Sequence, residues 1–265
     1  MTEEAKEVAS PPPPPAKTWY SVPTSLNCLS ENIRDDALLE TELLFLAFAT
    51  GIQDAATYPD YLAFASNQTG NTIILAVSAA GLDMGDAMLP SVANPLMSLG
   101  MFLAGALVLG QLGNYFGCRK RSWLLLTNFL QTAMAFAATA IQYRYPIYVT
   151  GSTALIVLAL LAFSSGGQVA MARSLKINEI TTAMATSAYV DLFVDPQLLR
   201  WKNRPRNRRA LFLVALFVGS FVGAFAYKKV NSPFVLLLSA VGKFVVMCAF
   251  LFNGKMKGRK VEGKS

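Results

Sequence analysis

Long apolar segments separated by short polar linkers run through most of this chain of 265 residues. They lie near residues 38–58, 61–81, 92–116, 123–142, 147–172, 180–194, 210–227 and 233–253. Six of these segments reach the length of about 20 residues that a helix needs to cross the hydrocarbon core of a bilayer. Because lipid offers no hydrogen bonds to a polypeptide backbone, such segments cross a membrane as helices. The pattern predicts an all-α, polytopic transmembrane helix bundle.

The composition supports this class. Hydrophobic residues make up 54% of the chain and charged residues only 15%, whereas about a quarter of the residues in a soluble domain are charged. A net charge of +7 would suggest nucleic acid in a soluble protein, but here the basic residues lie between apolar segments. They are better explained as topology determinants that face an anionic leaflet. We therefore expect the lipid bilayer as a partner and no nucleic acid.

The residue types that most often carry out catalysis or bind metals are absent or scattered. The chain has no histidine, and its three cysteines, Cys28, Cys118 and Cys248, show no paired spacing. A catalytic triad with histidine and a histidine-ligated metal are excluded, and a zinc site or a disulfide framework is not supported. Chemistry by carboxylate, lysine or tyrosine remains open, but no catalytic residue, metal or cofactor is predicted.

The two ends of the chain differ from its middle. Residues 1–37 are predicted to be a disordered cytoplasmic tail with a juxtamembrane segment, because Pro11 to Pro15 favour an open polyproline II helix. Residues 38–253 form the predicted transmembrane domain, and residues 254–265 form a basic cytoplasmic tail.

Charge counting separates two topologies. The segment at 61–81 is interrupted by Ser66 to Thr72, and the segment at 180–194 is short and rich in threonine and alanine. If both are broken or re-entrant, Arg119 to Arg121, Arg200 to Arg209 and the basic C-terminal tail share one side of the membrane. That arrangement follows the positive-inside rule and places both termini in the cytoplasm. We therefore expect six full spans plus two broken or re-entrant polar segments. Eight spans are the alternative, because short loops can violate the rule.

Two polar motifs inside the apolar sequence resemble one another. The first is Gly51-Ile-Gln53-Asp54-Ala55, followed by the block from Asn67 to Thr72. The second is Gly166-Gly167-Gln168-Val169-Ala170, followed by the block from Thr181 to Ser187. Polar groups at matching places in two halves are typical of a site between the repeats of a membrane transporter. We predict an internal repeat with halves of about 38–142 and 147–253, which are inverted if each half has three full spans.

The polar residues of these motifs are the candidate substrate-binding residues: Gln53, Asp54, Asn67, Thr69, Gly70, Asn71, Gln168 and Thr186. Amides, hydroxyls and the freed backbone groups of a broken helix can replace water around a solute. The alternative for Asp54 is a place at the membrane interface, where it caps the next segment. The alternative for the block from Asn67 to Thr72 is hydrogen bonding between helices.

Lys243 lies near the middle of the last apolar segment. An ammonium at that depth must find a partner, extend its side chain to the interface or lose its proton. We predict that Lys243 forms a charge pair inside the bundle with Asp54 or Asp191.

Two further features have simple structural explanations as well as functional ones. The segment from Arg200 to Arg209 holds six cations beside Trp201, which is compatible with anionic lipid contact but is better explained as a topology signal. Gly219 and Gly223 have the spacing of close helix packing, either within one chain or in a homo-oligomer.

Taken together, these residues resemble the YoaK-like family of multi-pass membrane proteins, a domain of unknown function. The resemblance rests on Gly51-Ile-Gln-Asp54-Ala, Asn67-Gln-Thr69-Gly70-Asn71 and Gly167-Gln168, and it covers roughly residues 40–253. This chain has Thr186-Ser187 where that family usually has a Thr-Gly pair. The proline-rich tail and the turn from Tyr58 to Tyr61 are similar to fungal members. The resemblance implies a multi-pass membrane protein and no established activity.

We therefore expect an integral protein of the plasma membrane that acts as a transporter or channel-like protein for an unidentified small solute. The alternative is a non-transporting membrane scaffold or assembly factor, whose polar residues only join helices. An enzyme acting on lipid is the third and weakest possibility, because the sequence contains no recognisable nucleophile and base. We do not expect an enzyme.

Overall fold

The computed structural model describes residues 29–82 and 91–254, so most of the two predicted tails lies outside the described residues. The described part is helical, apart from one isolated bridge between Asn32 and Lys120. Its helices are α2 (Ala37–Tyr61), α3 (Gln68–Ala79), α4 (Ala93–Phe116), α5 (Arg121–Arg144), α6 (Ser152–Ser174), α7 (Ala185–Phe193), α8 (Arg204–Lys229) and α9 (Ser232–Ala249). The prediction of an all-α protein is confirmed for this part of the chain.

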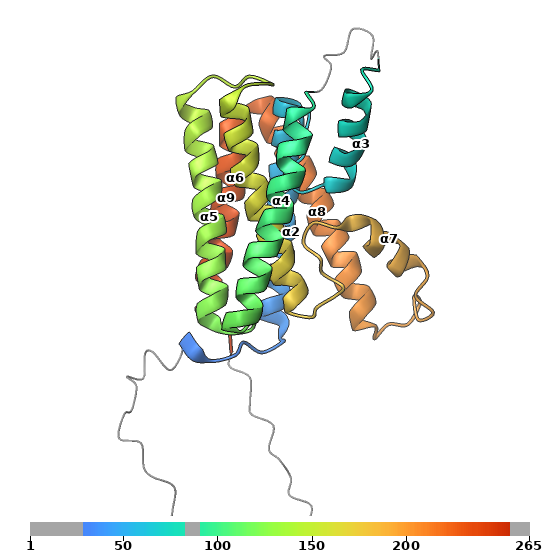
Figure 1. Ribbon diagram of the computed structural model, residues 1–265. Coiled ribbons are helices and arrows are strands. Elements are labelled where there is room, and N and C mark those ends of the chain that lie inside the picture. The colour runs from blue at the N-terminus through green and yellow to red at the C-terminus, as the bar shows by residue number, and fades with distance from the viewer. Residues whose placement is uncertain (1–28, 83–90, 255–265) are drawn as a thin grey trace, which may run out of the picture.

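Six long helices, α2, α4, α5, α6, α8 and α9, form the bundle (Figure 1). The end of the bundle where residues 31–34, 119–121 and 254 hydrogen-bond to one another is called the basal end. The opposite end, where Asn94 donates to the carbonyls of Tyr61 and Val149, is called the distal end. Helices α2, α5 and α8 run from the basal to the distal end, and α4, α6 and α9 run back (Figure 1).

Five of the long helices, α4, α5, α6, α8 and α9, have the length and hydropathy to cross a membrane. Helix α2 is as long but carries the four carboxylates Glu40, Glu42, Asp54 and Asp60. It is nevertheless packed among the other long helices, chiefly along α8 and α9. The protein is therefore an integral membrane protein with several apolar helices.

The predicted segments at 61–81 and 180–194 contain only short helices. Helix α3 has 12 residues and α7 has 9, so they are about 18 and 14 Å long. Neither can cross a hydrocarbon core of about 30 Å. Left-handed backbone at Leu62 (φ 50°), Lys176 (φ 58°) and Thr182 (φ 62°) breaks the chain before each of them. The two short helices pack against α4 and α8, respectively, and flank the bundle (Figure 1).

Helix boundaries differ from the predicted apolar segments where turn residues intervene. The segment predicted at 147–172 begins as a helix only at Ser152, because Gly151 adopts a φ of 116° in the preceding turn. The last helix ends at Ala249 rather than at residue 253.

Four glycines let two helix pairs approach to backbone contact. A Cβ atom on Gly51 or Gly219 would overlap a carbonyl oxygen across the α2–α8 interface, that of Leu216 or Phe48, respectively. Gly166 and Gly105 meet Phe102 and Phe163 in the same way across the α4–α6 interface. Both pairs of helices depend on residues without side chains, which is how membrane helices pack closely.

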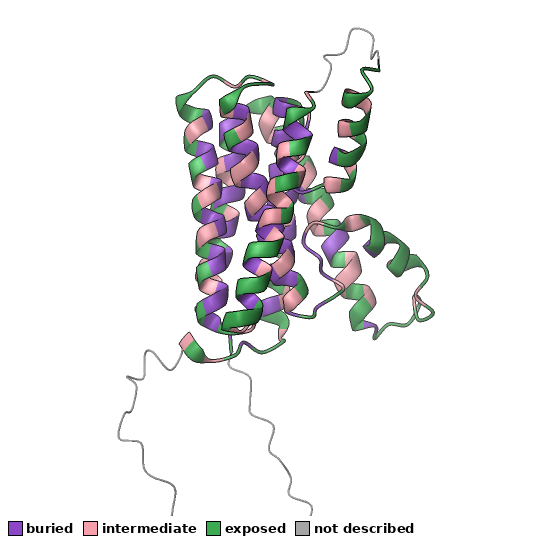
Figure 2. Cartoon of the chain, viewed as in Figure 1, coloured by how far each residue is buried: buried purple, intermediate pink, exposed green. Residues whose placement is uncertain are grey.

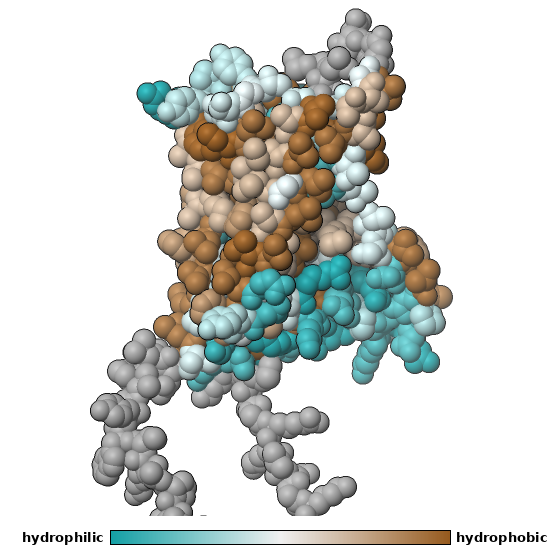
Figure 3. All heavy atoms as spheres, in the orientation of Figure 1, coloured by the Kyte–Doolittle hydropathy of each residue, from teal (hydrophilic) through white to brown (hydrophobic). Residues whose placement is uncertain are grey.

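Burial and hydropathy follow the bundle. Buried residues face the centre of the long helices, and the exposed residues lie on their outer sides (Figure 2). On the face shown in Figure 3, hydrophobic residues cover the long helices and hydrophilic residues gather at the basal end. The molecule thus presents an apolar surface suited to contact with lipid between its two ends.

Candidate functional site

Polar side chains cross the middle of the bundle between α2 and α6. The amide nitrogen of Gln53 donates to the Ser165 hydroxyl at 2.9 Å, and that of Gln168 donates to the Thr50 hydroxyl at 2.9 Å. Each helix therefore supplies one glutamine donor and one hydroxyl acceptor, three residues apart. All four residues are buried, so the two bonds satisfy groups that would be costly in an apolar interior.

Lys243 joins this layer from α9. Its Nζ donates to Gln168 Oε1 at 2.8 Å and to Ser164 Oγ at 3.3 Å, and the residue is only 1% exposed. Ser164 in turn donates to the main-chain carbonyl of Gln131 on α5 at 3.2 Å. The polar residues contributed by four helices are Thr50, Gln53, Gln131, Ser164, Ser165, Gln168 and Lys243, which we call the central cluster.

The predicted direct ion pair of Lys243 is not formed. Within the described residues no carboxylate oxygen lies within 4.0 Å of its ammonium. Asp54 interacts with it electrostatically over a longer distance, because its carboxylate is turned toward the segment before α3. Asp191 is exposed on α7 and lines a surface cleft near the basal end instead. Neutral oxygens, rather than a carboxylate, therefore surround the buried ammonium.

The central cluster retains unused hydrogen-bonding capacity. Gln53 Oε1 and Gln131 Oε1 are buried and accept no hydrogen bond, and Thr132 Oγ1 on the adjoining turn of α5 also lacks a partner. Lys243 has three N–H groups and uses two of them. Buried donors and acceptors without partners call for an explanation, and a role in function is one.

Asp54 fixes the chain between α2 and α3. Its Oδ1 accepts from the N–H groups of Ala65 and Ser66 at 3.1 and 3.0 Å, and its Oδ2 accepts from the Ser66 hydroxyl at 2.5 Å. Asn71 completes the turn: its Oδ1 accepts from the N–H of Phe64, and its Nδ2 donates to the carbonyl of the same residue. Both side chains therefore hold the non-helical backbone that precedes α3.

The other predicted site residues do not reach the central cluster. Asn67 caps α3 by accepting from the N–H of Gly70 at 3.1 Å, and Gly70 lies against the ring of Phe64. Thr69 on α3 and Thr186 on α7 are exposed on the outside of the bundle. The eight predicted residues thus separate into the central glutamines, the groups that hold the turn before α3, and the exposed threonines.

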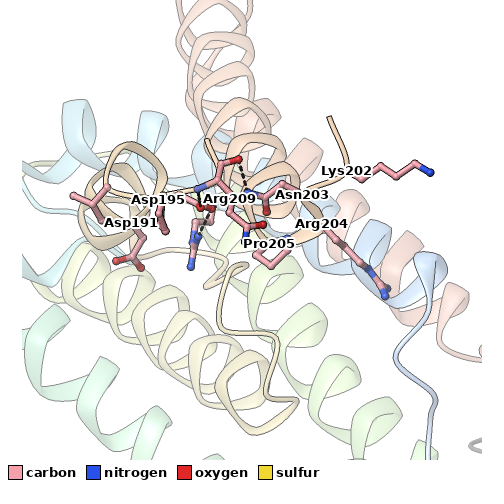
Figure 4. Close-up of a pocket in the computed structure, with 10 residues that line it drawn as sticks. Asp191, Asp195, Lys202, Asn203, Arg204, Pro205 and Arg209 are labelled. Atoms are coloured by element: carbon pink, nitrogen blue, oxygen red, sulfur yellow. Dashed lines mark hydrogen bonds and ion pairs between the residues drawn. The ribbon is translucent and has the colours of Figure 1, made fainter. Parts of the chain in front are cut away.

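A surface cleft of about 490 Å³ lies where α7 meets the start of α8 (Figure 4). Within it, Arg209 pairs with Asp195 at 3.5 Å and Asn203 donates to the same carboxylate at 3.0 Å. The N–H of Gln197, followed by the Asn203 side chain, holds the pKa of Asp195 below its usual value. This cleft is organised by internal partners.

Arg208, in the same basic segment, is also engaged inside the protein. Its guanidinium lies 2.9 Å from Asp35, 2.8 Å from Glu40 and 3.4 Å from Glu179. These carboxylates come from the segment before α2, from α2 itself and from the segment between α6 and α7. Arg208 therefore ties three parts of the basal end together, in addition to any effect of its charge on topology.

Sequence reasoning missed Thr50, Gln131, Ser164 and Ser165, four of the seven residues of the central cluster. A signal was present, since Ser165 precedes Gln168 by the same interval as Thr50 precedes Gln53. Gln131 also carried a signal, because it holds the place in the run 124–131 that Lys243 holds in the similar run 236–243.

Comparison with known proteins places the chain in a family. No curated protein and no solved structure matches it. The family model described as "Protein of unknown function (DUF1275)" matches residues 43–249, from the first turns of α2 to the end of α9. The match includes the whole central cluster and both short helices. The chain therefore belongs to the DUF1275 family of proteins of unknown function.

Proposed function

We propose that this membrane protein is a transporter or channel-like protein that carries a small solute through the centre of its bundle. The observation that supports this most is the central cluster, where a fully buried ammonium meets only neutral oxygens. A buried charge inside a membrane domain is expensive, and such charges generally mark a pathway or a binding site. The unpartnered oxygens of Gln53 and Gln131 supply further groups for a polar solute.

We further propose that the halves 38–142 and 147–253 are inverted repeats. The reciprocal bonds of Gln53 and Gln168 support this, since each glutamine reaches the hydroxyl three residues before the other. Gly51 and Gly166 also precede these glutamines by two residues and make equivalent backbone contacts. A short helix follows each of α2 and α6. Inverted repeats allow a central site to open alternately to the two sides of a membrane.

In this proposal the predicted residues have different tasks. Gln53 and Gln168 contact the solute, and Lys243 provides the charge. Asp54 and Asn71 hold the turn that leads into α3, so they position the site without contacting the solute. Asn67, Thr69, Gly70 and Thr186 line the starts of the short helices, where a solute would meet them on its way to or from the centre.

The proposed topology has six full spans, with α3 and α7 as re-entrant elements that do not cross. Arg119, Lys120, Arg121 and the segment from Arg200 to Arg209 lie at the basal end, with the ends of the described chain. The positive-inside rule then makes the basal end cytoplasmic. We propose the plasma membrane as the location, a YoaK-like, fungal type within the family, and no enzymatic activity.

Two interactions with the surroundings complete the proposal. The segment from Arg200 to Arg209, of which Lys202 lines the cleft in Figure 4, is proposed to meet anionic lipid headgroups at the cytoplasmic surface. Homo-oligomer formation is proposed through the exposed sides of α4 and α8. Gly219 and Gly223 are not the contact, because they are buried against α2 within one chain.

A membrane scaffold or assembly factor is the competing function. The same polar residues would then serve only to join helices, as they do in many bundles. Substitutions that remove function without removing protein distinguish the two, because a scaffold loses function together with its packing.

The test compares Gln53→Leu and Thr69→Val with Thr139→Ala, whose hydroxyl bonds only within α5. Each variant replaces the wild-type protein in cells, and growth on panels of single nutrients and toxic solutes is scored with membrane abundance. Loss of a solute-dependent phenotype at normal abundance in Gln53→Leu supports transport. Reduced abundance alone, with growth falling in proportion, supports the scaffold.

A further inference from the structure

A second polar cluster lies at the distal end and involves none of the central residues. It is centred on Asp60 in the last turn of α2, which is 5% exposed. Its Oδ1 accepts from the Tyr227 hydroxyl at 2.7 Å, and its Oδ2 accepts from Gln142 Nε2 at 2.9 Å and from the Ser232 hydroxyl. Four helices, α2, α5, α8 and α9, therefore meet at one carboxylate.

The carboxylate of Asp60 has no cationic partner. Within residues 29–82 and 91–254, no lysine or arginine nitrogen lies within 4.0 Å of it. Three neutral donors point at it, and such donors favour the charged form of a carboxylate. Among the described residues, the distal end therefore holds one buried carboxylate that no cationic side chain contacts.

When Asp60 is ionised, the oxygens in this cluster outnumber the hydrogens that could separate them. Gln142 Nε2 donates to Asp60 and to the Tyr61 hydroxyl at 2.8 Å, which turns Gln142 Oε1 toward Ser232. Ser232 Oγ lies 3.1 Å from that oxygen and is also bonded to Asp60. Because a hydroxyl has a single hydrogen, it cannot bridge both oxygens at once. With Asp60 ionised, one oxygen–oxygen contact is left without a hydrogen between the two atoms, and either a proton on Asp60 or a bound cation would relieve it.

An entry route lies beside the cluster. Asp60, Tyr227, Asn231 and Ser232 line a cleft of about 380 Å³ at the distal end, together with apolar residues of the turn before α6. In the proposed topology this cleft faces away from the cytoplasm. A small ion could reach the carboxylate from that side without passing the central cluster.

We propose that the Asp60 cluster binds a monovalent alkali cation. Carboxylate, amide and hydroxyl oxygens are the ligands that hard cations take, and one carboxylate balances one positive charge. A divalent ion is disfavoured, because the described residues contain no group of three or more acidic, cysteine or histidine side chains. The role of this ion as the coupling ion of transport rests on the proposed function, whereas its binding does not.

The experiment measures thermal unfolding of the purified full-length protein in detergent at constant ionic strength. Choline chloride is replaced stepwise by lithium, sodium or potassium chloride. A ligand that binds only the folded state raises the melting temperature as its concentration passes the dissociation constant. We expect a saturable rise of about 5 °C with at least one alkali cation and none with choline.

Variants locate the site. Asp60→Asn should abolish the rise, and Ser232→Ala should increase the half-saturating concentration about tenfold, since about 1.4 kcal/mol corresponds to a factor of ten. Asp191→Asn, which neutralises an exposed carboxylate on α7, should keep the wild-type response.

Three results would overturn the site: equal melting temperatures in all salts, an undiminished response in Asp60→Asn, or stabilisation by protons with which no alkali cation competes. If Asp60→Asn does not fold, an unchanged half-saturating concentration in Ser232→Ala overturns it. Gln168→Leu alters the central cluster and should keep the cation response. The cation response of Asp60 can therefore be present or absent whether or not the central cluster serves transport, and the two proposals can fail independently.

Discussion

Gln168 accepts a hydrogen bond from the Lys243 ammonium at 2.8 Å and donates its own amide hydrogen to Thr50 at 2.9 Å. One buried side chain thus connects α9, α6 and α2 in the middle of the bundle. The Gln168 amide therefore links the charged group of Lys243 to the contact between α6 and α2. A change in the distance between α6 and α9 would therefore alter the environment of the charge directly.

The Lys243–Gln168 bond should show strong energetic coupling. Gln168→Leu leaves a buried ammonium with one acceptor fewer, and we expect a loss of about 2 kcal/mol, as for hydrogen bonds to charged groups. Lys243→Met leaves Gln168 Oε1 without its hydrogen-bond donor, but it also removes the buried charge. The double variant should be more stable than the sum of the single effects predicts, which a double-mutant cycle of unfolding in detergent measures.

The comparison for that cycle is Lys243→Met with Asp54→Asn. Their carboxylate and ammonium interact only over a longer distance, so the two effects should be closer to additive. A coupling energy for Asp54 as large as that for Gln168 would contradict the geometry and restore the predicted ion pair.

The sequence was informative where a pattern occurred twice. Gln53 and Gln168 could be selected because each follows a glycine by two residues inside an apolar segment. Since only such matched positions stand out from ordinary polar residues in a bundle, these two were found together. Together with Lys243, they are the predicted residues that lie in the central cluster.

The sequence was uninformative about which helices touch. Lys243 was expected to pair with a carboxylate because an unpaired charge inside a membrane is costly, yet Ser164 and Gln168 of α6 are the residues at its ammonium. Thr69 and Thr186 belong to the same motifs but start helices on the outside of the bundle. The packing of the helices against one another decides such contacts, and the spacing of residues in a single sequence does not reveal that packing.

Glycine contacts on α4 should differ sharply along one helix. Gly105→Ala places a methyl group into the backbone of Phe163, so α4 and α6 must move apart, whereas Gly100 has nothing within 4 Å of an added Cβ. We expect Gly105→Ala to lower stability by about 1–3 kcal/mol, the usual range for overpacking. Gly100→Ala is the matched control and should be neutral or slightly stabilising. Similar melting temperatures for both variants would show that the interface is looser than described.

The turn before α3 should depend on the shape and charge of Asp54. Asp54→Asn replaces an oxygen that accepts from two backbone N–H groups, or turns its own NH₂ toward Ser66, so the segment 62–67 should loosen. The measurement is the maleimide labelling rate of Asn67→Cys in a background without native cysteines. We expect labelling to be severalfold faster when Asp54→Asn is added. Ser66→Ala keeps the two backbone bonds and should have the smaller effect.

Labelling should also establish which end of the bundle faces the cytoplasm. Lys120 and Trp201 are exposed at or near the basal end, and Tyr148 is 66% exposed in the turn before α6 at the distal end. In a variant lacking Cys28, Cys118 and Cys248, single cysteines replace each of these residues in turn. The positive-inside rule predicts that a membrane-impermeant maleimide labels position 148 in intact cells and positions 120 and 201 only after permeabilisation. Labelling of positions 120 and 201 from outside, with 148 protected, would invert the whole molecule. Labelling of 120 but not 201 from outside would mean that α7 or its preceding segment crosses the bilayer, which its nine residues do not allow as a helix.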